Sequence, residues 1–437
     1  MIIKINSPVY DVSSGLCSIK LSLSATKVST VVIDFKKLLP HANSVSKETL
    51  DFFILSAAVY GIDRFIKRKI YSVDGWSREI DVQFPVENVN KWQPTTNSLN
   101  SLLSFLTGDY WNISFYQSTF IIPPQLAIKH DKQFTQVSLF SGGLDSLIGA
   151  IDFLKANPTY KGLFVSHYDH QMGGPRGDQL GLTKVLVANF PNFTYFPSIN
   201  VSLEKSTILK ETTFRSRSIL FIGIATLLAE SNRINRIIVP ENGSVSLNFP
   251  LSTSRRSACS TRTTHPTVLN HIRYIWDILG IKITIANPYE LQTKGEMVNN
   301  CRDHVLLQKL LKISNSCGKR GHRAHWNIKD ATHCGVCMPC VYRRAALTDF
   351  KDTTTYGNDI NSFSSFLSKK SQDVGACLEY LKIPLTNQEI KNELIVNGVK
   401  DLALLPNYTQ VVDRTRKELK NWFKKFGNQN IKNKGGI

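Results

Sequence analysis

The chain has 437 residues with a hydrophobic fraction of 42%, and its formal net charge is +19. A chain of this length and composition is an ordinary globular protein with two or three domains, and its positive charge favours anionic ligands or partners. Its longest apolar runs, 52–60 and 219–229, are too short to span a membrane and no secretory signal pattern opens it, so we expect a cytoplasmic protein without a membrane partner.

Residues 1–128 are predicted to form a separate α+β accessory domain. Short apolar or alternating runs predict strands at 2–5, 18–23, 31–35, 80–84 and 111–115. An amphipathic pattern over 47–69 predicts a helix. The region contains no chemical motif, so we expect it to pack passively or to bind a partner. The polar, proline-containing stretch from 122 to 136 is interpreted as a linker.

From residue 137 the pattern changes to alternating strands and helices. Strands are predicted at 137–140, 162–166, 236–239 and 281–285, with helices beginning near Asp145 and over 219–230. This alternation indicates an α/β domain over 137–312, with a parallel sheet and helices on both faces. Ligands bind at the carboxyl ends of such strands, so the loops 141–145, 167–176 and 241–248 should surround one crevice.

A turn rich in glycine and serine follows the first of these strands: Ser141-Gly142-Gly143-Leu144-Asp145-Ser146. A strand, a glycine turn and a helix N-terminus together form an anion site, because glycine admits close approach and free N–H groups favour phosphate oxygens. Ser141 and Ser146 add hydroxyl donors, and Asp145 offers an oxygen ligand for Mg²⁺. The turn is neither a Walker A loop nor a dinucleotide fingerprint. The alternative is a turn that merely caps a helix.

Four of the eight cysteines are grouped: Cys317, Cys334, Cys337 and Cys340. Two overlapping Cys-x-x-Cys steps favour a metal over disulfides, and four thiolates suit a closed structural Zn²⁺ site within 313–350. An iron–sulfur cluster is the competing interpretation, and His325 or His333 are alternatives to Cys317 as a ligand. The scattered cysteines are interpreted as core or surface thiols.

Residues 351–437 are predicted to form a helical, basic C-terminal region. Its lysines and arginines fit either a solvated helix or a docking surface. Trp422, Phe423 and Phe426 among these charges indicate an apolar face that packs on the protein's own domain.

The glycine–serine turn and the cysteine segment together resemble the 7-cyano-7-deazaguanine synthase (QueC) family, whose members are N-type ATP pyrophosphatases with a PP-loop. The resemblance covers about residues 137–350 and rests on an ordered set of motifs: 141–146, 214–218 with the apolar helix after it, Pro288 with 293–298, and Ser316-Cys317 with Cys334 to Arg343.

Membership in that family implies a Rossmann-like sheet of the adenine nucleotide alpha-hydrolase (HUP) type that binds ATP, Mg²⁺ and Zn²⁺. It implies adenylation of the carboxylate of 7-carboxy-7-deazaguanine, release of pyrophosphate and transfer to ammonia. Asp145 would then bind Mg²⁺, and Arg217 and Lys294 would balance phosphate charge. Apart from the resemblance, the place of His167 after the second predicted strand suggests contact with the nucleotide or the substrate, and an ordinary polar loop residue is the alternative. The pyrophosphate would lie against the turn: Ser141, Gly142, Gly143, Leu144 and Ser146.

The chain departs from the synthases in the stretch 260–266, where only Pro266 of their base-binding segment clearly remains, and in its added terminal regions. These departures resemble the QueC-like proteins of bacterial anti-phage operons, such as QatC of the Qat system. The acceptor in that setting would be an amine of a partner protein from the same operon. The alternatives are a PP-loop enzyme that adenylates a tRNA base, which the +19 charge favours, and a nucleotide-sensing subunit without turnover.

Overall fold

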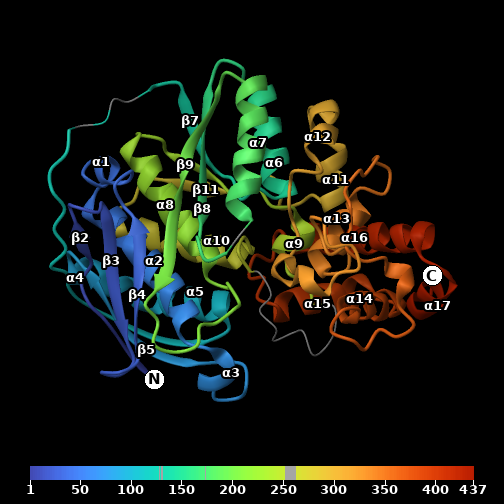
Figure 1. Ribbon diagram of the computed structural model, residues 1–437, viewed down its shortest axis with the longest axis horizontal. Helices are drawn as coiled ribbons and strands as arrows, with labels where there is room; N and C mark the ends of the chain where they lie inside the picture. The colour runs from blue at the N-terminus through green and yellow to red at the C-terminus, as the bar shows by residue number, and fades with distance from the viewer. Residues whose placement is uncertain (127, 129–130, 173, 251–261) are drawn as a thin grey trace.

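The computed structural model describes residues 1–126, 128, 131–172, 174–250 and 262–437. Within these ranges the strands form an eleven-stranded mixed sheet in the order β11-β10-β7-β8-β9-β4-β3-β1-β5-β6, with β2 beside β3. Figure 1 shows this sheet on the left and a mostly helical region on the right. The strands are β1 (Ile2–Ile5), β2 (Val9–Asp11), β3 (Leu16–Ser22), β4 (Val28–Asp34), β5 (Glu79–Val86), β6 (Tyr110–Gln117), β7 (Phe134–Leu139), β8 (Lys161–Tyr168), β9 (Phe193–Glu204), β10 (Arg236–Ile238) and β11 (Thr284–Ala286).

The helices lie on the sheet and in the C-terminal region. They are α1 (Leu39–Ala42), α2 (Lys47–Phe65), α3 (Arg68–Tyr71), α4 (Val89–Trp92), α5 (Thr96–Thr107), α6 (Leu144–Ala156), α7 (Pro175–Asn189), α8 (Arg217–Ser231), α9 (Gly243–Ser246), α10 (Pro266–Leu279), α11 (Lys294–Asn299), α12 (His304–Leu310), α13 (Met338–Ala346), α14 (Gln372–Lys382), α15 (Asn387–Val396), α16 (Leu405–Phe426) and α17 (Gln429–Gly435). Among the described residues, no helix has the length and apolarity that crossing a bilayer requires.

The strands β11, β10, β7, β8 and β9 are paired in parallel. Across the sheet, β8 and β9 lie on one side of β7, and β10 and β11 lie on the other side. The strand order therefore reverses between β7 and β10. The connections leave these two strands in opposite directions, which opens a crevice at their carboxyl ends. The topology therefore marks one position for a ligand site.

Helices cover both faces of these parallel strands, because alternate strand residues point to opposite faces. Val137 and Leu139 belong to a core that also contains residues of α2, α8 and α10. Phe140 and Phe164 belong to a second core, with residues of α6, α7 and α12. The α/β architecture with helices on both faces, expected from the sequence, is therefore present, in a mixed sheet that is mostly parallel.

The N-terminal strands belong to this same sheet, which corrects the expectation of a separate module ending near residue 128. Strand β4 pairs antiparallel with β9, with Val31 opposite Leu203. The core on that face is one continuous cluster of side chains, whose members extend along the chain from Ile3 to Ile285. The sequence boundary at 128 is thus a change in local pattern, with no gap in the sheet or the core.

Helix α2 joins the N-terminal strands to α8. The sequence predicts an amphipathic helix, but α2 is buried along nearly its whole length, which corrects that prediction. Its contact with α8 is close, since a Cβ atom on Gly223 would lie 2.7 Å from Ser56 Oγ. Glu230 at the end of α8 accepts hydrogen bonds from Ser46 N and Thr49 Oγ1 at the start of α2. These contacts fix the two helices against each other.

A buried ion network secures the other end of α2. Asp63 and Asp109 both pair with Arg68 and Arg78, at 2.5–2.8 Å. Burial raises the pKa of Asp63, but the charges of Arg68 and Arg78 outweigh it and hold the pKa at about 2. Removing one partner from such a network leaves an uncompensated buried charge and costs about 3–5 kcal/mol.

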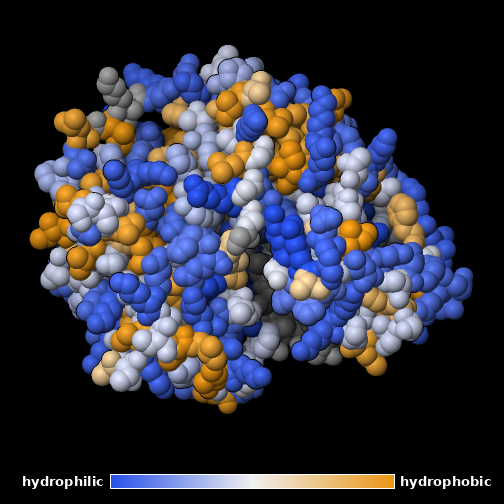
Figure 2. Space-filling view, in the orientation of Figure 1, coloured by the Kyte–Doolittle hydropathy of each residue, from blue (hydrophilic) through white to orange (hydrophobic). Residues whose placement is uncertain are grey.

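The C-terminal helices pack on the protein itself, as the aromatic residues of the region predict. Trp422 and Phe423 of α16 are buried, whereas Phe426 is 44% exposed. Helix α16 also reaches the loops after the parallel strands, where Thr415 Oγ1 and Ser244 Oγ are 2.5 Å apart. Figure 2 shows hydrophilic side chains over much of one face of the molecule, interspersed with separate apolar patches, which is the usual mixture of a protein surface.

Candidate active site and metal centre

The glycine–serine turn lies between β7 and α6, as the sequence predicts. Gly142 has φ of +87°, a conformation that favours glycine, and its carbonyl accepts a hydrogen bond from Asn315 N at 2.9 Å. Gly143 precedes α6 without a side-chain cap, which leaves N–H groups of the first helical turn for an anion. The hydroxyl oxygens of Ser141 and Ser146 lie 3.2 Å apart at the same place.

A cavity of about 340 Å³ opens beside this turn, at the switch point between β7 and β10. The turn forms one side, and the loop and short helix after β10 form the opposite side. A third, largely apolar wall comes from residues near and within α13. The lining residues are Ser141, Gly143, Leu144, Asp145, Ser146, Pro240, Glu241, Ser244, Val245, Asn248, Phe249, Pro250, Lys294, Asn315, Ser316, Met338, Pro339 and Tyr342.

Asp145 and Lys294 form an ion pair in this cavity. Asn242 Nδ2 donates to the second carboxylate oxygen of Asp145 at 2.6 Å. Lys294 is the first residue of α11, whose start is fixed by a capping box between Thr293 and Glu296. The side chain of Lys294 is 6% exposed, so its charge acts in a region largely shielded from water.

Glu241 supplies a second carboxyl group to the cavity. Its backbone is held by Asn287, whose Oδ1 accepts from Glu241 N at 3.3 Å and whose Nδ2 donates to Glu241 O at 2.7 Å. Thr264 donates a hydrogen bond to Glu241 Oε2. Burial, with a smaller effect from the charge of Asp145, raises the pKa of Glu241 to about 7, against the opposing effects of the Thr264 hydrogen bond and the charge of Lys294.

His167 and Arg217 lie away from this cavity, so the expectation that the loop 167–176 borders the crevice is not met by the described residues. His167 is a strand residue of β8, and its buried ring lies against Tyr60 and Phe221 at 5.4 and 5.5 Å between centroids. Burial lowers its pKa to about 3. Arg217 begins α8 and lies over the ring of Phe221. Both side chains point to the face covered by α2 and α8, opposite the turn.

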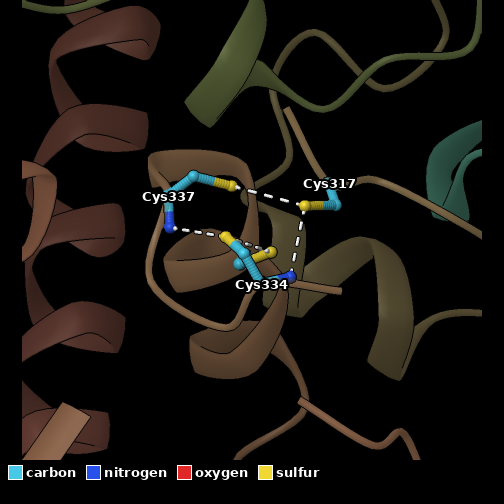
Figure 3. A group of neighbouring side chains, drawn as sticks. Cys317, Cys334 and Cys337 are labelled. Carbon is cyan, nitrogen blue, oxygen red and sulfur yellow. Dashed lines mark hydrogen bonds between the residues drawn. The ribbon is translucent and has the colours of Figure 1, made fainter. Parts of the chain in front are cut away.

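The four clustered cysteines come together as predicted. Their sulfur atoms all lie within 4.8 Å of one another, and the residues are Cys317, Cys334, Cys337 and Cys340. The Sγ atoms of Cys317 and Cys337 are 4.0 Å apart, and those of Cys334 and Cys340 are 3.8 Å apart (Figure 3). Ligands at about 2.3 Å around a tetrahedral Zn²⁺ are separated by about 3.8 Å. The group can hold a single metal ion, and its geometry is compatible with zinc.

Backbone groups around the cysteines stabilise thiolates. The N–H groups of Cys334 and Cys337 point at Cys317 Sγ and Cys334 Sγ, at 3.3 and 3.2 Å (Figure 3). Gly335 has φ of +81°, which allows the chain to turn between Cys334 and Cys337. The alternative ligands are placed otherwise: His333 Nε2 accepts from Ser316 N at 3.3 Å, and His325 lies exposed outside the group.

The metal segment also builds the cavity. Ser316, next to Cys317, accepts a hydrogen bond from Leu144 N at 3.4 Å. Met338, Pro339 and Tyr342 belong to α13, the helix that follows Cys337 and carries Cys340, and they line the apolar wall. A metal bound by the cysteines would therefore fix one wall of the cavity and its contact with the turn.

Sequence reasoning missed several residues of the cavity. Asn242 lies in a loop that the sequence places at the crevice, but its contact with Asp145 was not expected. Asn315, Ser316 and Tyr342 lie near the cysteines, and their proximity to the turn has no signal in local sequence. Comparison of the chain with protein-family models, with curated proteins and with solved structures found no match.

Proposed function

We propose that this protein is a QueC-like, ATP-dependent ligase of the PP-loop class, with a HUP-type nucleotide-binding domain over the parallel strands. It adenylates the carboxylate of 7-carboxy-7-deazaguanine or a related deazapurine and releases pyrophosphate. The adenylate then passes to an amine, either ammonia or an amine of a partner protein. The observation that carries this proposal is the cavity at the point where the strand order reverses. The glycine–serine turn lines this cavity, and its Asp145 forms an ion pair there with Lys294.

Phosphate groups of ATP are assigned to the side of the cavity formed by the turn. Ser141, Ser146 and the free N–H groups at the start of α6 are donors fixed in place before the ligand arrives. Lys294 provides a buried positive charge beside them. Mg²⁺ bound by Asp145 would neutralise the charge on the departing pyrophosphate.

The substrate ring is assigned to the apolar wall. Phe249, Met338 and Tyr342 offer flat or deformable surfaces that suit a planar heterocycle. Binding the ring there would place its carboxylate toward the turn, where it attacks the α-phosphorus of ATP. The chemistry then depends mainly on positioning and charge neutralisation.

The metal centre is assigned a structural role. Four cysteine ligands leave no open position for a substrate, and the neighbouring Asn315 and Ser316 connect the group to the turn by hydrogen bonds. The strands and helices added at both ends support a place among the QueC-like proteins of anti-phage defence, where partner proteins would supply the amine.

The first test is pyrophosphate release from MgATP with and without 7-carboxy-7-deazaguanine. We expect release that depends on the carboxylate in the wild type and falls more than about 100-fold in Asp145→Asn, because the buried charge at the phosphate site is lost. Asp152→Asn is the matched control. Asp152 is on the same helix but bonds Tyr289 and Arg302 outside the cavity, so release should stay within about threefold.

Absence of release with this carboxylate, from a protein that still binds ATP, would overturn the deazapurine assignment. Salt-dependent binding of tRNA with a defined footprint would then point to RNA as the substrate. Where release occurs, mass spectrometry of co-expressed operon proteins distinguishes the acceptors, since a protein amine gains the mass of the deazaguanine acyl group and ammonia leaves the proteins unchanged.

A further inference from the structure

Two carboxyl side chains line the cavity among the described residues, and they are held differently. Asp145 is engaged on both oxygens, by Lys294 and by Asn242. Glu241 has a hydrogen bond from Thr264 to Oε2, and its side chain forms the cavity wall on the β10 side. Oε1 of Glu241 is therefore available to a ligand, whereas both oxygens of Asp145 have partners beside the turn, where the proposed function places Mg²⁺.

Glu241 is also rigidly placed. It lies in the loop after β10, and Asn287 beyond β11 holds both its N–H and its carbonyl. Thr264 fixes the carboxyl from a third segment. A group fixed by three segments and directed into a cavity meets the geometric requirement for transferring a proton to or from a bound ligand.

Transfer of an acyl group from an adenylate to an amine requires a proton acceptor. The amine nitrogen forms a bond to the acyl carbon and becomes positively charged, and the bond from that carbon to the AMP oxygen breaks. The product amide forms only when the nitrogen loses a proton. Asp145 and Lys294 are occupied with each other, so the side of the cavity away from the turn must supply the acceptor.

We propose that Glu241 is the general base that takes the proton from the attacking amine during acyl transfer. This inference rests on the proposed function and deepens it, because it assigns the second half-reaction to a residue on the β10 side of the cavity. The first half-reaction, adenylation, is left to the turn, Asp145 and Lys294. The substrate of this step is an amine that enters the cavity uncharged and leaves as an amide.

The ionisation of Glu241 suits this role. Burial raises its pKa to about 7, so the carboxylate is present near neutral pH and is a stronger base than an exposed glutamate. The neighbouring charges oppose each other, since Asp145 raises the pKa and Lys294 lowers it.

The test separates adenylation from transfer in Glu241→Gln, which keeps the shape of the side chain and its bond to Thr264. We expect carboxylate-dependent exchange of labelled pyrophosphate into ATP to stay within about threefold of the wild type. Amide formation from ammonia should fall about 100-fold or more, the usual contribution of a general base. Hydroxylamine, a good nucleophile with a more easily lost proton, should restore much of the transfer rate.

Asp51→Asn is the matched control. Burial also raises the pKa of Asp51 to about 7, but Asp51 lies on α2 and accepts from Glu87 N at 2.8 Å, outside the cavity. We expect both half-reactions of this variant to match the wild type. The wild-type transfer rate should rise with pH through the titration of Glu241, and that rise should disappear in Glu241→Gln.

Equal loss of exchange and of transfer in Glu241→Gln would overturn the proposal, because it would assign Glu241 to adenylation. Unchanged transfer would overturn it as well. Absence of exchange in the wild type would instead overturn the proposed function itself, and the two failures are therefore distinguishable. An unchanged thermal transition and metal content in Glu241→Gln establish that the variant is folded.

Discussion

Asp145 meets Lys294 and Asn242 because three segments converge on one cavity. Asp145 comes from the first turn of α6, Asn242 from the loop after β10, and Lys294 from the start of α11. Each segment follows a strand of the parallel sheet. Charges drawn from three connections in this way are held by the whole sheet, so their separation changes little when one loop moves.

The side chain of His167, in contrast, is enclosed by other side chains of the protein and does not face the cavity. Its Nε2 lies 3.2 Å from Val201 O, and its ring is enclosed by Tyr60 and Phe221. The place of this residue after the second predicted strand suggests contact with the nucleotide or the substrate, but the residue does not line the cavity.

We expect His167→Gln to leave the KM for ATP in pyrophosphate release within about twofold of the wild type, because Gln retains a donor for Val201 and no ligand contact is lost. Ser146→Ala, which removes a hydroxyl from the turn, is the positive comparison and should raise that KM. A large rise in KM for His167→Gln would return the residue to the nucleotide site.

The metal segment acts as an element that joins two parts of the site. Cys317 directly follows Ser316, which contacts the turn, and Cys340 belongs to α13, which carries the apolar wall. Coordination of all four cysteines would hold these two parts together. A short irregular segment of this kind has little apolar surface of its own, so a metal supplies much of its folding energy.

We expect Cys334→Ser to reduce bound zinc from about one ion per chain to nearly none, because three thiolates do not close a structural site. Elemental analysis of the purified protein measures this directly, and pyrophosphate release should be lost with the metal. Cys377→Ser is the control: Cys377 is equally buried in the same core but lies outside the group, so zinc should be retained. Iron with acid-labile sulfide in the wild type would contradict the zinc assignment.

At the scale of the whole molecule, the N-terminal strands and the parallel strands share one sheet and one core. Two histidines, His167 and His265, are buried along this shared core or beside it, and a third, His41, is partly buried. Burial lowers the pKa of His41 to about 4 and those of His167 and His265 to about 3.

These histidines predict a stability that depends on pH. The pKa of these histidines in the unfolded chain is 6.5. As the pH falls below that value, the histidines are therefore protonated in the unfolded chain while they stay neutral in the folded chain. Their contribution is fully present above about pH 6.5 and decreases toward the folded values, by up to about 1.4 kcal/mol per pH unit for each histidine. Urea unfolding at several pH values measures the slope, and His167→Gln should reduce it by up to one proton. Asp51 and Glu241, whose pKa values burial raises to about 7, bind protons in the folded state over the same pH range and oppose this slope. The test is therefore the difference between the two proteins, and equal slopes for the wild type and His167→Gln would contradict the prediction.

Much of the fold was predictable because its signals are local. Short apolar patterns predict the strand at 162–166 and the helix after the turn, and the structure has β8 and α6 at these positions. The long strand β9 was missed, since its polar residues interrupt the apolar pattern. Helix α2 was expected to be amphipathic, but both α8 and the sheet pack on it, and no pattern within α2 indicates this burial.

The sequence by itself determined the glycine–serine turn, the four clustered thiols and the alternation of strands and helices, because each depends on residues close together in the chain. Tertiary structure alone decided that Glu241 and Lys294 share a cavity with Asp145, that Arg217 and His167 lie outside it, and that residues 1–128 continue the sheet. The physical reason is that strand order and side-chain direction arise from packing between distant segments. A strand residue displaced by one position points to the opposite face, and only the assembled sheet specifies which face holds the ligand.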